Sequence, residues 1–206
     1  MTRRVVLYGG TFDPVTVGHI VVADQAHRML EPDEFWFLVN NVPGERRAVH
    51  APAEVRLEMV HAAVAGDPRF TVSDLEIRRG GVTYTAETME ALHRMRPDEE
   101  FALLAGADSA RSIRTWRYGD RLLEGERFVI VNRSGEDPLT LREAAGLGYD
   151  AARTRLLEIA SPRVSASEVR RRVARRQSLD GLVPGPVAAI IQREGLYGGR
   201  PHPHNG

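Results

Sequence analysis

A glycine pair and a histidine near the start of the chain are the residues best suited to chemistry. Gly9 and Gly10 follow a short apolar run, Val5–Tyr8, and His19 comes just before an amphipathic stretch, Ile20–Leu30. Glycines let backbone N–H groups approach an anion, and a helix N-terminus adds free donors and a favourable dipole. The spacing therefore predicts a phosphate site, with His19 in the first helical turn facing the phosphate.

A second segment near the other end of the chain has the same character. Ser165, Ser167 and Arg170 follow the apolar run Leu156–Ile159 and open another helical pattern. Two hydroxyls, free amides and an arginine can together clamp a triphosphate. Ser165 with Glu168 three residues later also has the spacing of a capping box, which is purely structural. Both interpretations can hold at once.

Further candidate residues follow predicted strands or lie in the polar stretch 114–120, and each has two interpretations. Asp108, after Gly106, can accept from a ribose hydroxyl or help hold a metal, or it can simply cap the next helix. Trp116 can stack on a flat ring or fill the core. Arg133 can pair with a ligand anion or lie on the surface. Asn40 ends a strand, where turn residues are expected in any case.

The composition excludes several classes of chemistry. The chain has 206 residues, no cysteine, no lysine, and 28 arginines against 28 acidic residues. Without cysteine there are no disulfides or thiolate sites, and we expect a reducing cytoplasm. Without lysine the glycine turn is not a Walker P-loop. The zero net charge and the lack of a long apolar run predict no nucleic-acid or membrane partner. The oligomeric state stays open.

Short apolar runs alternate with helical patterns, which is typical of βαβ units. This alternation predicts an α/β fold with a doubly wound parallel sheet, in which ligands bind at the carboxyl ends of the strands. We expect one domain over residues 1–197 and a disordered tail over 198–206. The predicted strands are 4–8, 34–40, 70–73, 101–105, 127–131 and 156–159, and the predicted helices are 18–30, 52–65, 85–96, 109–117, 139–147, 165–176 and 185–194.

Two motifs resemble those of a known superfamily. Thr16-Val17-Gly18-His19 is similar to the (H/T)xGH motif of the nucleotidylyltransferases, and Val164–Arg170 is similar to their second motif. Further segments resemble the nicotinate-nucleotide adenylyltransferases, and the likeness covers nearly all of residues 3–197. It implies a Rossmann-like sheet with a small C-terminal helical part. It also implies direct transfer of AMP from ATP to nicotinate mononucleotide, with Mg²⁺ bridging the phosphates. The segments are Thr83–Thr88, Gly106–Ser109, Thr115–Trp116, Phe128–Arg133 and Leu182–Tyr197.

The resemblance also implies roles for individual residues. The catalytic group would be His19, Thr16 and Arg170. The ATP site would comprise Gly9, Gly10, Thr11, Phe12, Gly18, Gly106, Asp108, Ser165 and Ser167. The acceptor site would comprise Asn40, Arg46, Tyr84, Thr85, Trp116 and Arg133. No side chain is assigned to a metal, because the phosphates would hold the Mg²⁺.

Three departures from the family pattern surround the acceptor. Thr16 stands where that family usually has histidine, and threonine is typical of pantetheine-phosphate adenylyltransferases. The loop Val42–Arg47 replaces the usual Pro-Pro-His-Lys, and Arg117 stands where an aromatic residue is expected after Trp116. The same chemistry on pantetheine phosphate or another phosphorylated metabolite is therefore an alternative. A nucleotide-binding regulator without catalysis is a further one.

Overall fold

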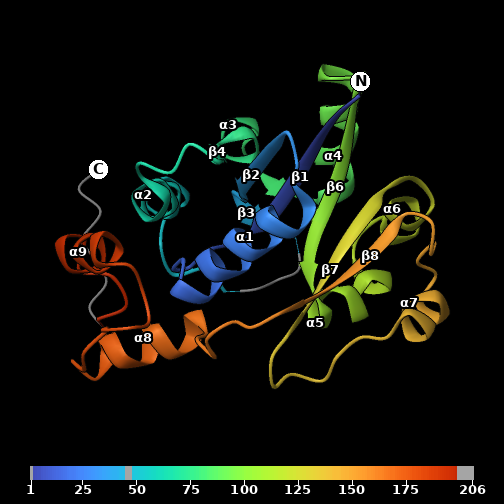
Figure 1. Ribbon diagram of the computed structural model, residues 1–206. Coiled ribbons are helices and arrows are strands. Elements are labelled where there is room, and N and C mark those ends of the chain that lie inside the picture. Colours follow the sequence, from blue (N-terminus) through green and yellow to red (C-terminus); the bar gives the residue numbers. More distant parts are fainter. Residues whose placement is uncertain (1, 45–47, 199–206) are drawn as a thin grey trace.

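A six-stranded sheet organises the protein, and every neighbouring pair of its strands is parallel. The computed structural model describes residues 2–44 and 48–198. The strand order is β4-β2-β1-β6-β7-β8 (Figure 1). The bounds are β1 Arg3–Gly10, β2 Glu34–Val39, β4 Phe70–Ser73, β6 Glu99–Gly106, β7 Arg127–Arg133 and β8 Thr154–Ile159. A separate parallel pair joins β3 (Val42–Pro43) to β5 (Val82–Thr83). The predicted doubly wound parallel sheet is confirmed.

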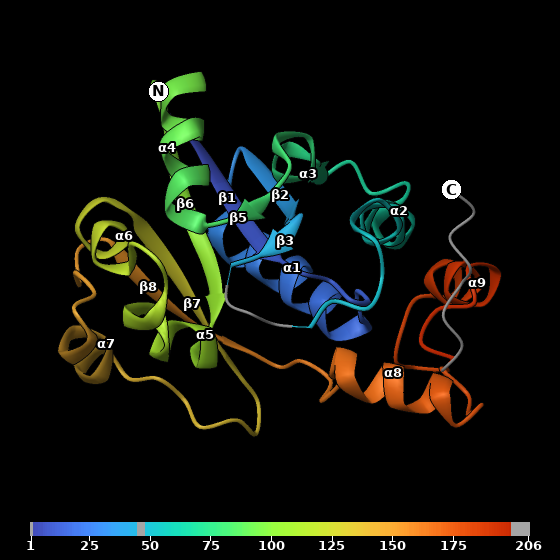
Figure 2. The same ribbon diagram turned by 180° about the vertical axis from the view of Figure 1, so that it is seen from behind.

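Helices cover both faces of this sheet, because successive side chains of a strand point to opposite faces. In β1, Val6 packs into one apolar cluster, whereas Val5 and Leu7 pack into the other. Figures 1 and 2 show the two faces. The first cluster includes α1 (Val17–Leu30), α2 (Ala53–Val64), α8 (Ala166–Ala174) and α9 (Gly185–Arg193). The second includes α4 (Thr85–Met95), α5 (Ala107–Arg111), α6 (Gly119–Gly125) and α7 (Leu141–Leu147).

The predicted helix over 109–117 is wrong. The chain forms α5 up to Arg111 and then the 3-10 turn η1, Ile113–Thr115. The turn that follows is tightly packed and requires glycine at position 119, since a Cβ there would lie 2.1 Å from the carbonyl oxygen of Ile113. The short elements α3 (Leu75–Arg79), α6, β3 and β5 were not predicted, because such short segments carry little hydrophobic periodicity.

The predicted tail, 198–206, lies outside the described residues apart from Gly198. Among the described helices, none is both long and apolar enough to cross a membrane. The loops that matter for the site follow the carboxyl ends of the strands: β1 leads into α1, β6 into α5, and β8 into α8. Parallel strands end at one edge of a sheet, so these three loops meet there.

Candidate active site

The turn after β1 is shaped by the ring of Phe12. This residue has a positive φ of 48°, and its ring is buried against Tyr8 and His19. The ring covers Gly10 so closely that a Cβ there would lie 2.8 Å from it, whereas space above Gly9 is open. Gly10 is therefore required for packing, and Gly9 leaves room for a ligand. The Phe12 ring is buried and supports His19 from the core.

Thr16 and His19 hold each other at the start of α1. Thr16 is fully buried and is the N-cap, and its Oγ1 accepts from the His19 N–H at 3.4 Å. The Thr16 N–H donates to His19 Nδ1 at 2.9 Å. A backbone N–H can only donate, so Nδ1 accepts, and the proton of the neutral ring lies on Nε2. His19 is thereby fixed as an Nε2–H donor.

The environment keeps the His19 ring neutral. Burial, and secondarily the charge of Arg133, lower the pKa of His19 to about 4. At neutral pH the ring therefore donates a hydrogen bond without carrying a charge. Arg133 ends β7 and pairs with both carboxylate oxygens of Glu136, at 3.0 and 2.7 Å. The same positive charge also lowers the pKa of Tyr8, against the larger effect of burial, which raises it.

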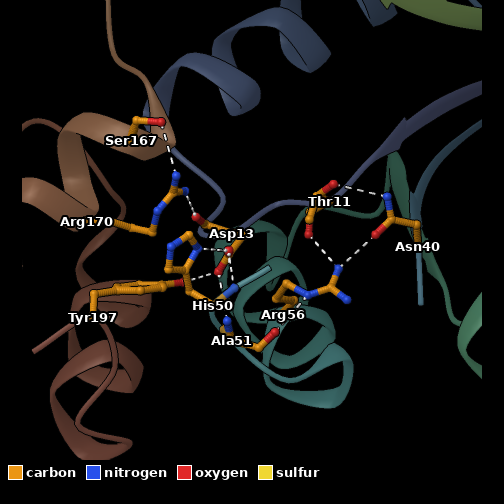
Figure 3. Close-up of polar contacts among 9 residues, drawn as sticks. All are labelled: Thr11, Asp13, Asn40, His50, Ala51, Arg56, Ser167, Arg170 and Tyr197. Carbon is orange, nitrogen blue, oxygen red and sulfur yellow. Dashed lines mark hydrogen bonds and ion pairs between the residues drawn. The ribbon is translucent and has the colours of Figure 1, made fainter. Parts of the chain in front are cut away.

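The structure brings the two motifs together through Arg170. Its Nη1 donates to the backbone carbonyl of Asp13 at 2.6 Å, and its Nη2 donates to Ser167 Oγ at 3.1 Å (Figure 3). Ser165 is the N-cap of α8 and accepts from the Glu168 N–H at 3.1 Å. Only this half of the expected capping box forms, because the Glu168 carboxylate pairs with arginines of its own helix instead, Arg171 and Arg172.

Asp108 does not cap the helix that follows β6, which was the structural alternative for this residue. Gly106 is the N-cap of α5, and Asp108 lies one residue inside the helix. Its side chain is 79% exposed and lies 3.8 Å from Arg111. A Cβ on Gly106 would meet nothing within 4 Å. The end of β6 therefore offers open space with a solvated carboxylate beside it, which suits a hydroxyl-bearing ligand.

Asn40 is directed toward the glycine turn rather than away from it. Its Nδ2 donates to Thr11 Oγ1 at 3.1 Å, and its Oδ1 accepts from Arg56 at 3.1 Å (Figure 3). Arg56 is 1% exposed and also donates to the carbonyls of Thr11, Asn41 and Ala51. These bonds tie the end of β1 to the end of β2.

The sequence did not predict two buried polar groups, the Arg56 guanidinium and the hydrogen bonds around the Asp13 carboxylate. The Asp13 carboxylate is buried and accepts from the His50 and Ala51 N–H groups and from the Tyr197 hydroxyl (Figure 3). A carboxylate inside a phosphate-binding turn was one signal, since it would repel a phosphate. An arginine on the inner face of α2, in line with Met59 and Val60, was the other.

Two of the predicted acceptor residues, Tyr84 and Thr85, directly follow β5, whereas Asn40 and Arg133 lie elsewhere, against Thr11 and Glu136. The Tyr84 ring lies against Gly44, where a Cβ would come within 2.2 Å of it. The guanidinium of Arg117 lies 4.8 Å from the centroid of that ring. Trp116, next to Arg117, is half-buried and donates to Ser112 Oγ, and Thr85 begins α4. Arg46 lies outside the described residues.

No three His, Cys, Asp or Glu side chains of the described residues gather into a metal site.

A cavity of about 310 Å³ lies at the opposite edge of the sheet, between the starts of β1, β6, β7 and β8. Open parallel sheets bind ligands at the carboxyl ends of their strands, so this cavity is not the substrate site.

Comparisons with known proteins agree with this geometry. The Cytidylyltransferase-like family matches residues 7–172. A relative from Symbiobacterium thermophilum, named probable nicotinate-nucleotide adenylyltransferase, is 41% identical over 94% of this chain and 95% of its own length. A Thermus thermophilus relative of the same name is 40% identical over 94% of this chain and 99% of its own length.

A solved structure has the same fold. The nicotinic acid mononucleotide adenylyltransferase of Plasmodium falciparum, complexed with NaAD, superimposes with a TM-score of 0.81, 19% identity, and coverage of 95% of this chain and 97% of its own. Two motifs meeting at the carboxyl edge of a parallel sheet, together with these similarities, lead to one conclusion. The chain belongs to the Cytidylyltransferase-like family, with the nicotinate-nucleotide adenylyltransferases among its relatives, and is a nucleotidyltransferase.

Proposed function

We propose that this enzyme transfers AMP from ATP to the phosphate of nicotinate mononucleotide, releasing pyrophosphate and forming deamido-NAD. The observation that carries the proposal is the contact of Arg170 with the Asp13 carbonyl at 2.6 Å. It places an arginine and the N-terminus of α8 beside the N-terminus of α1. Two helix N-termini and an arginine at one point make a site for a polyphosphate.

The acceptor needs no general base. A phosphate monoester is already an oxyanion at neutral pH, with a second pKa near ~6. The work of the protein is to align the acceptor oxygen, the α-phosphorus and the departing pyrophosphate, and to stabilise the charge that spreads between them. The acceptor oxygen forms a bond to the α-phosphorus as the bond to pyrophosphate breaks, without a covalent enzyme intermediate.

His19 serves this reaction as a neutral donor. Its Nδ1 accepts from the Thr16 N–H, so Nε2–H donates to a phosphate oxygen. Arg170 supplies the positive charge, and the exposed hydroxyls of Ser165 and Ser167 supply further donors. Asp108, exposed at the end of β6, accepts from a ribose hydroxyl. These roles follow the family resemblance, and the geometry supports them.

Mg²⁺ would neutralise part of the triphosphate charge when bound. The described residues hold no cluster of three metal-ligating side chains. We therefore propose that phosphate oxygens and water hold the ion and bring it in with ATP. The chain's own residues orient the phosphates around it.

The acceptor ring is proposed to bind near Tyr84 and Trp116. Arg117, exposed above the Tyr84 ring, favours a ring that carries a carboxylate, because a cation attracts it. This supports nicotinate rather than nicotinamide. The names of the relatives support the same acceptor. Cytoplasmic location and the absence of a nucleic-acid partner stay predictions, and the oligomeric state stays open.

An acceptor panel tests the proposal. The protein is incubated with ATP, Mg²⁺ and either nicotinate mononucleotide, nicotinamide mononucleotide or pantetheine phosphate, and pyrophosphate release is measured. We expect the highest kcat/KM with nicotinate mononucleotide. The matched control is His19→Ala, with a kcat loss of at least ~10²-fold, the scale for one transition-state donor. If another acceptor gave the highest kcat/KM, the proposal that nicotinate mononucleotide is the acceptor would be wrong. ATP binding without pyrophosphate release from any acceptor would contradict the activity.

A further inference from the structure

A buried carboxylate lies in the middle of the phosphate-binding turn. Asp13 is 4% exposed, and both of its carboxylate oxygens are occupied. Oδ2 accepts from the His50 N–H at 2.8 Å, with His50 Nδ1 at 3.1 Å, and Oδ1 accepts from the Ala51 N–H at 3.1 Å. A carboxylate that faced bound phosphates at this position would weaken their binding by charge repulsion. Asp13 therefore holds structure instead of contacting ATP.

One partner of this carboxylate comes from the far end of the chain. The Tyr197 hydroxyl donates to Asp13 Oδ1 at 2.8 Å, across a separation of 184 residues. Burial raises the pKa of Tyr197, and the negative charge of Asp13 raises it further, so the hydroxyl stays protonated. The preceding Leu196 is fixed to the end of α9 through its N–H, which donates to the Ile191 carbonyl at 3.0 Å. The residues that follow α9 thus end against the turn after β1.

The same residue contacts the cation of the second motif. The backbone carbonyl of Asp13 accepts from Arg170 Nη1 at 2.6 Å, while the Asp13 side chain is held by Tyr197 (Figure 3). The side chain and the carbonyl belong to one residue, so a bond that anchors the side chain also restrains the backbone that carries the carbonyl. Arg170 Nη2 is held by Ser167. The orientation of the guanidinium therefore depends on Asp13.

We propose that Tyr197 is a positioning residue for nucleotidyl transfer. Through Asp13 it sets the direction in which Arg170 presents its guanidinium to the triphosphate. The segment that follows α9 is then part of the catalytic apparatus, although it lies outside both motifs. The inference rests on the proposed use of ATP and adds a residue that neither motif contains.

The test removes a single hydroxyl. Tyr197→Phe keeps the ring that lies 6.3 Å from His50 and removes only the bond to Asp13. We expect kcat/KM for ATP to fall roughly tenfold, the scale of one hydrogen bond to a charged group, with KM for the acceptor unchanged. The matched control is Arg193→Gln, which breaks the exposed ion pair of α9 with Glu58 of α2 at 2.7 Å. Its kinetics should equal those of the wild type.

A double-mutant cycle separates positioning from mere packing. If Tyr197 acts through Arg170, adding Tyr197→Phe to Arg170→Met causes no further loss of kcat/KM for ATP. A full additional tenfold loss in that background would overturn the proposal, as would wild-type kinetics of Tyr197→Phe alone. Circular dichroism melts establish that each variant is folded.

Direct binding keeps the two proposals distinguishable. Calorimetry with a non-hydrolysable ATP analogue needs no acceptor. If the wild type fails to bind the analogue, the proposed function fails. If the wild type binds it and Tyr197→Phe shows neither weaker binding nor slower turnover, the function stands and the positioning role of Tyr197 is wrong.

Discussion

Thr16 and His19 form a reciprocal pair in which each backbone N–H donates to the side chain of the other residue. The Thr16 N–H donates to His19 Nδ1 at 2.9 Å, and the His19 N–H donates to Thr16 Oγ1 at 3.4 Å. Thr16 thereby caps α1 through its hydroxyl. Position 16 is also where the sequence departs from the family pattern, which usually has histidine there. The proton of His19 is directed to Nε2 by a main-chain donor, so the identity of residue 16 does not change the tautomer.

Thr16→Ala tests this arrangement. The main-chain bond to Nδ1 survives, so we expect kcat to fall less than ~10-fold, while the lost cap lowers the free energy of unfolding by about 1 kcal/mol. Urea denaturation and steady-state kinetics measure the two effects. Thr140 is the matched control, since it forms the same reciprocal cap with Glu143 on exposed α7. Thr140→Ala should cost similar stability and leave turnover unchanged. A loss of kcat as large as that of His19→Ala would show that the hydroxyl itself is essential.

The pKa of His19 predicts a pH dependence. Burial and Arg133 lower it from 6.5 to about 4, so between these values the unfolded chain binds more protons than the folded one. The contribution of His19 to stability is therefore fully present above pH 6.5 and is lost as the pH falls toward 4. An NMR titration of the ligand-free protein should give a midpoint near pH 4. His19→Asn should lose less stability than the wild type over that interval. A midpoint near 6.5 would contradict the lowered pKa, and a midpoint above pH 7 would contradict the neutral-donor role.

Asp108 offers a test of the ATP site with little risk to folding. Its carboxylate is 79% exposed and lies 3.8 Å from Arg111, so Asp108→Asn should change the free energy of unfolding by less than ~0.5 kcal/mol. Loss of a charged acceptor for a ribose hydroxyl should raise KM for ATP roughly tenfold. The control is Asp137→Asn, which removes another exposed partner of Arg111, at 3.1 Å. An equal effect of both variants on KM would point to general electrostatics rather than to contact.

Arg56 is expected to matter for stability first. It is 1% exposed and donates to three backbone carbonyls and to Asn40. Arg56→Met leaves these acceptors without a donor, at about 1–3 kcal/mol for each one that stays buried, so we expect a loss of at least ~3 kcal/mol. Guanidinium denaturation measures it. Arg94→Ala, which removes an exposed pair with Glu90 on α4, should cost less than ~1 kcal/mol. Equal losses would contradict the bracing role of Arg56.

The order of strands and helices followed from the sequence because each long element carries its own periodicity. The runs that became β1, β6 and β7 were correctly placed, as were α1 and α8. The helix expected over 109–117 was wrong, because α5 ends at Arg111 and the chain passes through the short 3-10 turn Ile113–Thr115 into α6. Short elements such as α3 and α6 are stabilised by their neighbours, so local pattern could not reveal them.

The sequence by itself determined the two motifs that we expect to bind phosphate, since glycines, hydroxyls and helix starts are local properties of adjacent residues. Only the tertiary structure decided that Asp13 faces inward and that Arg170 rests on the turn after β1. These contacts join residues far apart in the chain, up to the 184 residues between Asp13 and Tyr197. Their geometry exists only once the sheet has brought its strand ends to one edge.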